Sequence, residues 1–246
     1  MKHSLLRAAA LLCLTACGGG ERAEGMTLEL GLTTTRARSA VGAEAARTLV
    51  TNEGARASLS GAFVTLGSVE LLPCEQSGWL RLLRGLSPVS TAWAHSTSSP
   101  LRLGTPHVVA LPQADGTVME LGVMSPPPGR YCRARLTFEP ADSDARGLTA
   151  AAEGAEGVDM VGRSLHLRGT LSPDLEPREF RVESRSRASV DVVLDGLTLS
   201  EEAPRAALVF ALAWDTWLDG MAPQESPDEV DLTGNVARSA TLHATP

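Results

Sequence analysis

The sequence has no hydrophobic run long enough to cross a membrane as a helix. Such a helix needs about 20 consecutive apolar residues, whereas the apolar segment 206–214 has only the length of a strand. Lysine is nearly absent, since Lys2 is the only one, and the arginines are scattered along the chain. A net charge of −7 without a basic cluster argues against a nucleic-acid-binding surface. We therefore expect no nucleic-acid partner.

Motifs that carry catalytic chemistry are also missing. Residues 162–166 begin like the nucleophile turn of a serine hydrolase, but they lack its second glycine. The acidic segment 142–153 has the spacing of a calcium loop, yet Arg146 stands where an oxygen ligand is needed. A solvated acidic loop is the alternative interpretation of that segment. Nothing resembles a nucleotide loop, a zinc-protease helix or a paired-carboxylate site, so we expect a protein that is not an enzyme.

The first 16 residues have the pattern of an export signal. Lys2 and Arg7 flank the start of a short apolar stretch at 8–14, which is too short to span a bilayer. Small residues then precede Cys17, and this arrangement resembles the lipobox of bacterial lipoproteins. The resemblance implies a signal peptide at 1–16, a lipid on Cys17 and a lipidated tether at 17–26. The alternative is an ordinary signal peptide with an incidental cysteine.

A lipidated Cys17 implies attachment to a membrane of the cell envelope. Gly18 follows it where inner-membrane lipoproteins usually carry a retention aspartate. We therefore expect a lipid-anchored protein at the outer membrane that faces the periplasm or the cell surface.

Four cysteines are present, and two of them are accounted for by export. Cys13 leaves with the signal peptide and Cys17 takes the lipid, which leaves Cys74 and Cys132. A pair of cysteines in an exported chain usually forms a disulfide. Closing that loop would stabilise the fold by roughly 4 kcal/mol on the chain-entropy model. The alternative, a pair of free thiols that bind metal, lacks the close spacing of thiolate sites.

The patterning of apolar residues predicts an all-β fold. After the turn at 125–130, residues 132, 134, 136 and 138 are apolar while arginines occupy 133 and 135, which is the period of a half-buried antiparallel strand. Aromatic residues are few, at 4%, but hydrophobic residues make up 43% of the chain, enough for one core. Similar patterns predict further strands at 27–34, 48–50, 56–59, 61–72, 107–111, 118–123, 161–168, 180–184, 188–194 and 206–214.

About nine short strands with Gly and Pro turns predict an antiparallel β-sandwich at 27–218. The segment 206–214 is continuously apolar and is expected in the middle of a sheet. Residues 219–246 are polar and rich in proline, and we expect a weakly structured C-terminal tail there.

The tripeptide Trp93-Ala94-His95 lies inside the loop that the predicted disulfide would close. It resembles the copper motif of exported bacterial copper-binding proteins of the MbnP and MopE/CorA type. The surrounding layout is similar too, with Thr-Asn-Glu-Gly at 51–54 and Pro-Pro-Gly-Arg-Tyr at 127–131, so that the resemblance covers 49–138. It implies that Trp93 and His95 hold copper.

Elementary coordination chemistry extends this set of ligands. Imidazole in a setting of low charge suits copper, and thiolates are committed to the disulfide. His107 is twelve residues from His95 across turn-forming prolines, so the two can meet, and His166 on a non-core strand face is the expected third histidine. The predicted metal site is therefore Trp93, His95, His107 and His166, with copper as the cofactor. The alternative is that the three histidines have separate roles: one solvated, one starting a strand and one exposed beside a neighbouring strand.

Two functions from different classes follow. The first is a membrane-anchored lipoprotein whose β-sandwich binds a ligand, with copper as the favoured ligand. The second is a non-catalytic structural or protein-interaction module of the cell envelope, with another envelope protein as its partner.

Overall fold

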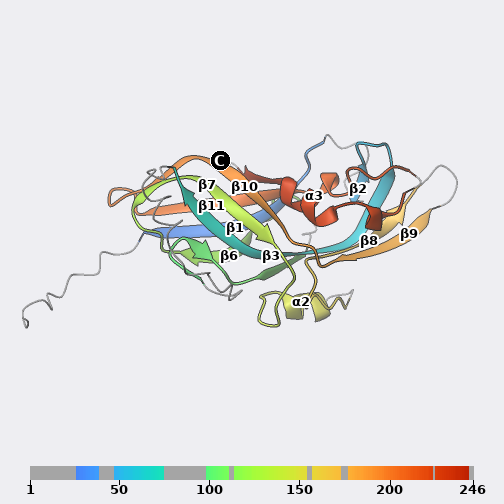
Figure 1. Ribbon diagram of the computed structural model, residues 1–246, viewed down its shortest axis with the longest axis horizontal. Coiled ribbons are helices and arrows are strands. Elements are labelled where there is room, and N and C mark those ends of the chain that lie inside the picture. Colours follow the sequence, from blue (N-terminus) through green and yellow to red (C-terminus); the bar gives the residue numbers. More distant parts are fainter. Residues whose placement is uncertain are drawn as a thin grey trace, which may run out of the picture.

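The computed structural model describes residues 26–38, 47–74, 98–110, 114–153, 157–172, 177–223 and 225–243. These residues form an elongated molecule of two β-sheets packed on each other, with little helix (Figure 1). The expected all-β sandwich is therefore confirmed. The described strands number twelve, against the nine or so expected, because several short strands carry no clear pattern in the sequence.

The smaller sheet has four strands and the larger has eight. The smaller sheet runs in the order β12 (Ala240–His243), β11 (Arg205–Ala213), β1 (Thr27–Thr35) and β6 (Met119–Met124). The path of the larger sheet is β10 (Ala188–Leu199), β7 (Gly129–Phe138), β3 (Arg56–Pro73), β8 (Leu165–Leu171) and β9 (Arg178–Ser184). Three short strands also pair with β3, namely β2 (Arg47–Val50), β4 (Arg102–Leu103) and β5 (His107–Ala110). All described pairs are antiparallel except β1 with β11, which is parallel.

The long strand β3 joins two strands that the sequence predicted separately. Its register shifts around Gly67, where the side chain of Glu139 occupies the space that a Cβ atom would need. The backbone amide of Thr65 donates to Ser164, and the Thr65 carbonyl accepts from Glu139. The N–H and C=O groups of one residue point to the same side of a strand. Because those of Thr65 bond to Ser164 before β8 and to Glu139 after β7, β8 and β7 lie one after the other along the same edge of β3. The strands β2, β5 and β4 occupy its other edge.

The main core lies between the two sheets. Leu28, Leu30 and Leu32 of β1 are at most 2% exposed, as their alternation predicted. Leu136 and Phe138 of β7 are fully buried opposite them. Burying one such side chain stabilises the fold by about 1.5–3 kcal/mol. The inward-facing side chains of these alternating strands therefore hold the two sheets together.

The alternation of β7 breaks at its beginning. Tyr131 is only 2% exposed, although the pattern placed it on the outer face, and its hydroxyl donates to the carbonyl of Pro127 at 2.7 Å. Cys132 is half-buried. Both neighbours of β7, the strands β10 and β3, shift their register between Tyr131 and Arg133. Two residues instead of one therefore separate the inward-facing side chains of Tyr131 and Ala134, which is a β-bulge. Burial raises the pKa of the Tyr131 hydroxyl.

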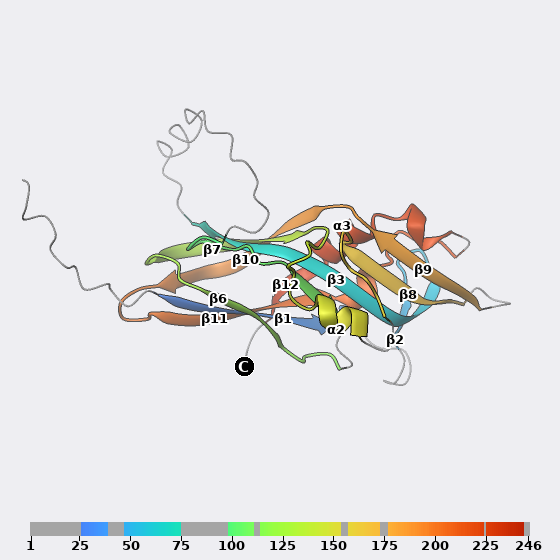
Figure 2. The same ribbon diagram turned by 90° about the horizontal axis from the view of Figure 1, so that it is seen from below.

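A second, smaller core covers the outer face of the larger sheet. The segment expected to be a solvated acidic loop contains α2 (Leu148–Glu153), which packs near β5 (Figure 2). This cluster consists of Phe63, Val108, Ala141, Ala145, Ala151, Val158 and Met160. The face that the sequence assigned to solvent at β8 is therefore partly buried.

The C-terminal region is folded and packs on the main core. After β11 come two 3₁₀ turns, η1 (Trp214–Thr216) and η2 (Pro227–Glu229), and the helix α3 (Leu232–Arg238). Asp231 begins α3 by accepting a hydrogen bond from the amide of Gly234 at 2.9 Å. Leu232 and Val236 are at most 3% exposed within the main core. The expectation of a weakly structured tail at 219–246 is therefore corrected for the described part of that region. The sequence did not indicate α3, because the helix has too few turns for its apolar period to stand out.

None of the helices in the described ranges is long and apolar enough to cross a membrane.

Candidate metal site

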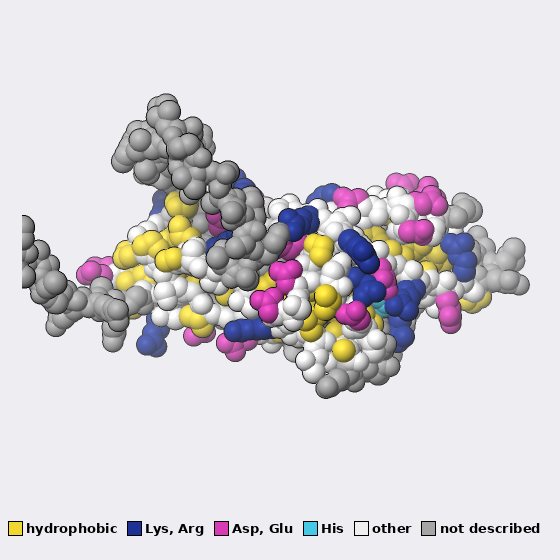
Figure 3. All heavy atoms as spheres, turned by 60° about the horizontal axis from the view of Figure 1, so that its bottom comes forward, with side chains coloured by type: hydrophobic (Ala, Val, Ile, Leu, Met, Phe, Trp, Pro, Cys, Tyr) yellow, Lys and Arg dark blue, Asp and Glu magenta, His cyan; other side chains and the backbone are white. Residues whose placement is uncertain are grey.

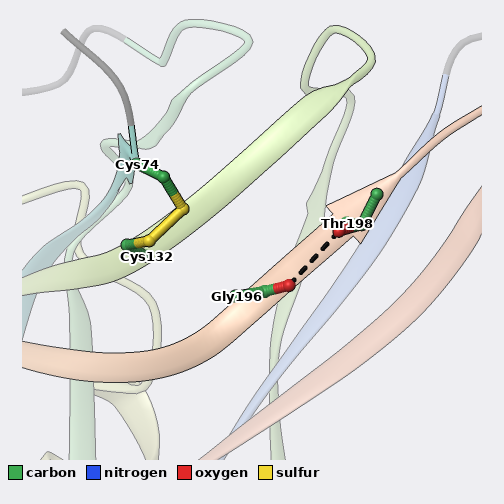
Figure 4. Close-up of a disulfide and its surroundings, with 4 residues drawn as sticks. All are labelled: Cys74, Cys132, Gly196 and Thr198. Carbon is green, nitrogen blue, oxygen red and sulfur yellow. Dashed lines mark hydrogen bonds between the residues drawn. A yellow bond between two sulfur atoms is a disulfide. The ribbon is translucent and has the colours of Figure 1, made fainter.

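The predicted disulfide is present at one end of the larger sheet. Cys74 follows β3 and Cys132 lies in β7, with 4.6 Å between their Cα atoms and a sulfur–sulfur bond of 2.05 Å (Figure 4). The amide of Cys74 also donates to the carbonyl of Arg130 at 3.0 Å. The disulfide thus fixes the point at which the segment containing Trp93 and His95 leaves the sandwich.

A bulge in β10 lies beside the disulfide. The register of β10 against β7 shifts between Val193 and Leu197, where Asp195 and Gly196 have positive φ angles of 48° and 82°. Figure 4 shows Gly196 and Thr198 on this strand, and the Thr198 hydroxyl donates to the Gly196 carbonyl at 3.2 Å. The positive φ at Gly196 suits glycine, because other L-residues rarely adopt it.

Trp93 and His95 lie outside the described residues, so their roles remain predictions. The chain is described again from Ser98. Ser99 pairs with Arg102, which in turn pairs with Glu70 of β3. Both ends of the 75–97 segment are therefore held against β3, one by the disulfide and the other by a short ladder of strands.

His107 begins β5 and faces the main core. It pairs with Leu66 of β3 and is 6% exposed. Its Nδ1 is 2.8 Å from the carbonyl oxygen of Thr105. A carbonyl only accepts, so Nδ1 carries the proton and Nε2 keeps its lone pair. Within the described part of the chain, Nε2 has no partner in hydrogen-bond geometry.

The His107 imidazole is also kept neutral. Burial lowers its pKa below 6.5, and the charge of Arg146 lowers it further. The carbonyl of Thr105 and the backbone of Leu121 oppose this effect without reversing it. A neutral imidazole with an available Nε2 is the form that binds a transition metal.

His166 is not brought to the same place. It pairs with Phe63 of β3, is 1% exposed and lies with its ring centroid 6.2 Å from that of Phe63, next to the smaller core. Residues that pair across two strands point to the same face of the sheet, and successive residues of one strand point to opposite faces. Residues 63 and 66 are three positions apart on β3, so they point to opposite faces. His107 and His166 are therefore on opposite faces of the larger sheet. The described residues contain no group of three His, Cys, Asp or Glu side chains that could hold a metal ion.

That His95 approaches His107 stays a prediction, because His95 lies outside the described residues, but the length of chain between His95 and Ser99 bears on it. The register places Arg102 opposite Glu70 and His107 opposite Leu66, which are about 13 Å apart along β3. His95 and Ser99 are four positions apart in the sequence, and such a segment spans at most about 14 Å. The length of chain thus allows these two imidazoles to share one ion.

Two surface grooves offer no better metal site. One, of about 580 Å³, is lined by residues of β8 and β9, among them Arg168, Arg181 and Glu179. On the same strand β9, Glu183 accepts from Arg163 at 2.6 Å and from Arg181 at 2.8 Å. Basic and acidic side chains are intermixed on the side of the molecule seen in Figure 3, without a patch of one sign.

The second groove, also of about 580 Å³, is acidic and is lined by residues near α3. Its Asp219 is already bound by the guanidinium of Arg38 and by the backbone amide of Asn52. These contacts tie the end of β1 and the β2–β3 turn to the C-terminal region. They stabilise the fold and leave no open set of ligands at Asp219.

A buried polar cluster around Trp214 escaped sequence analysis. The indole is fully buried and its Nε1 donates to Asp115 at 3.0 Å. The guanidinium groups of Arg36 and Arg47 lie 4.7 and 5.2 Å from the ring centroid, which places them in cation–π contact. Burial lowers the pKa of Arg47. No local motif could have indicated this cluster, because its members are distant in the sequence.

Comparisons with known proteins bear on the fold. No protein family model matches the chain, and no curated protein sequence matches it. Among solved structures, the chain is similar to MbnP from Methylosinus trichosporium, with 11% sequence identity and a TM-score of 0.36. The similarity covers 81% of this chain and 79% of that chain.

Proposed function

We propose that the protein is a lipid-anchored protein of the cell envelope that binds copper through His107 and His95, with Trp93 beside the ion. The observation that carries the proposal is the state of His107. Histidines that bind metals usually donate the other ring N–H to a carbonyl or carboxylate, which orients the ring. Thr105 provides that carbonyl, and the buried Nε2 has no hydrogen bond of good geometry within the described residues.

Copper is favoured among the metals for reasons of ligand chemistry. Both cysteines of the described residues are joined in the disulfide, so neither provides a thiolate ligand. Two imidazoles without a supporting set of carboxylates suit copper, zinc, nickel or iron better than magnesium, calcium or manganese, and copper has the highest affinity in the Irving–Williams order of divalent ions. His166 is left out of this ligand set, because it lies on the opposite face of the sheet from His107.

The lipid anchor is part of the proposal and rests on the sequence. Cys17 ends a lipobox-like pattern, and the first strand begins at Thr27. A lipid on Cys17 would hold the sandwich at a membrane through a tether of only a few residues. We propose the outer membrane as that membrane, on the strength of Gly18.

The copper site is tested by titration of purified protein with copper near neutral pH. We expect His95→Ala and His107→Gln to lose copper at least about tenfold, as loss of a ligand or its supporting contact does. His243→Ala is the matched control, since His243 lies on β12 of the other sheet, and it should bind like wild type. Circular dichroism checks that His107→Gln is folded.

Two results would refute the copper site. One is a wild-type protein, purified from copper-replete cells, that neither contains nor takes up copper. The other is equal binding by wild type and His95→Ala, which would put the ion elsewhere. In the first case the function of an interaction module would be favoured instead.

A further inference from the structure

We infer that one end of the sandwich, the disulfide end, faces the lipid bilayer. The disulfide end is defined by Met26, Cys74, the turn 125–128 and the turn 200–204. This inference rests on the proposed lipid anchor at Cys17 and goes beyond it, because it states which surface of the protein the membrane meets.

The hydrogen-bond register brings these segments together. Thr27 begins β1 and its amide donates to Pro204, while Leu28 pairs with Met124 at the end of β6. The turn 125–128 then leads to Gly129 at the beginning of β7, which pairs with Leu199 at the end of β10. The Cys74 amide donates to Arg130. The tethered N-terminal side of β1 and the disulfide are therefore at the same end.

The opposite end of the molecule is far away. It carries the turn between β2 and β3 together with the ends of β8 and β9 (Figure 2). The strand β3 runs between the two ends from Arg56 to Pro73, a length of about 55 Å at 3.3 Å per residue. Both surface grooves are lined by residues of this far half, such as Arg168 and Asn52.

The length of the tether decides between the two ends. Nine peptide steps separate Cys17 from Met26, and a chain of that length spans at most about 32 Å. If the far end touched the bilayer, Met26 would be about 55 Å from it, beyond the reach of the tether. An upright molecule can therefore stand only on its disulfide end.

The surface of this end suits contact with headgroups and not insertion. Its exposed side chains are small, cyclic or acidic, namely Ser125, Pro127, Pro128, Glu201, Glu202, Ala203 and Pro204, and the exposed Arg130 and Arg205 lie directly beside them in the sequence. Both signs of charge are present, so the end neither requires nor excludes anionic lipid. No large aliphatic or aromatic side chain is exposed among these residues, and the lipid on Cys17 supplies the membrane affinity.

The orientation has a consequence for the exchange of ligand. The segment 75–97 leaves the sandwich at Cys74 and returns at Ser98, beside β4, in the half of the molecule nearest the bilayer. A partner that contacts the protein between Cys74 and Ser98 would then approach it in the half nearest the membrane. The two grooves of the far half would point away from the membrane.

Energy transfer to vesicles tests the orientation. The full-length lipidated protein is labelled with a donor dye at one introduced cysteine, Glu201→Cys at the disulfide end or Glu53→Cys at the far end. Both positions are exposed. The vesicles contain phosphatidylethanolamine and phosphatidylglycerol, with an acceptor dye on a trace of the headgroups. We expect efficient transfer from position 201 and its loss at position 53.

Each other outcome is decisive. Equal transfer from both positions means that the sandwich lies flat on the bilayer, and stronger transfer from position 53 means that it is inverted; either contradicts the inference while leaving the anchor intact. The Cys17→Ser form of each labelled protein should lose transfer and fail to float with the vesicles. If it still floats, the proposed lipid anchor itself is wrong.

Discussion

At the scale of single residues, the parity of strand positions decides which histidines can act together. His107 and His166 both pair with β3, but their partners Leu66 and Phe63 point to opposite faces. The sequence predicted correctly that His166 lies on the strand face turned away from the main core, and its neighbours Leu165 and Leu167 are buried in that core. It could not show that β3 lies between the two histidines, because that depends on pairing between distant segments.

The sequence also could not show that the outer face near His166 is buried. The residues that cover it are mostly alanine, with Val158 and Met160, and they form no strong apolar pattern. Their burial depends on the small core around Phe63, which is assembled from four separate parts of the chain. Composition alone indicated an acidic loop, and the local interactions give no signal against that interpretation.

Glu183 provides a test at the residue scale through the pH dependence of stability. The hydrogen bond from Arg163, followed by that from Arg181, lowers the pKa of Glu183 below 4.5. A carboxyl group with a lowered folded-state pKa stabilises the protein above its unfolded-state pKa, and this stability is lost as the pH falls through the folded-state value. We expect wild type to lose stability below about pH 4.5 more steeply than Glu183→Gln, as measured by urea unfolding.

Glu179→Gln is the matched control, since Glu179 is exposed on the same strand and the substitution removes one carboxyl group in the same way. Its stability should fall with pH as steeply as that of wild type. Parallel curves for wild type and Glu183→Gln would show that the two arginines do not stabilise the ionised carboxylate.

At the scale of elements, alternation was a reliable guide where a strand is regular. The period of two placed Leu28, Leu30 and Leu32 in the core, and it identified most of β7. It failed at Tyr131, where a bulge reverses the inward side. It also divided β3 into the strands 56–59 and 61–72, at the point where the register against β8 shifts between Leu59 and Gly61. Bulges depend on how neighbouring strands pair, so the pattern within a single strand does not indicate them.

The disulfide was predicted from the number and compartment of the cysteines without any knowledge of the fold. The structure gives it a mechanical role, since it joins the end of β3 to the beginning of β7. It also holds one end of the segment that contains Trp93 and His95. The candidate site stays a prediction at Trp93 and His95, whereas the burial of His107 in β5 depends on tertiary structure that the sequence pattern does not indicate.

Removal of the disulfide should therefore affect stability and copper binding together. We expect Cys74→Ser with Cys132→Ser to lower the free energy of unfolding by about 4 kcal/mol, the entropy of closing a loop of this length in the unfolded chain. Urea unfolding followed by tryptophan fluorescence measures the change. The control is wild type treated with reductant, which should reach the same stability. An unchanged free energy of unfolding would mean that the disulfide removes little entropy from the unfolded chain.

At the scale of the whole molecule, the two ends of the sandwich differ along its long axis. One end carries the N-terminal side of β1, the disulfide and the turn between β10 and β11, while the other carries the grooves and α3 (Figure 1). The fold class followed from strand patterns and turn residues alone. The C-terminal region did not, because α3 is one short helix whose burial against the core decides its stability.

The most direct test of the account is X-ray absorption at the copper edge of the loaded wild-type protein and of His107→Gln. The account predicts that two imidazoles scatter around copper in wild type and that one of them is lost in the variant. A wild-type spectrum without imidazole scattering, or an identical spectrum in the variant, would contradict the proposal that copper binds at His107.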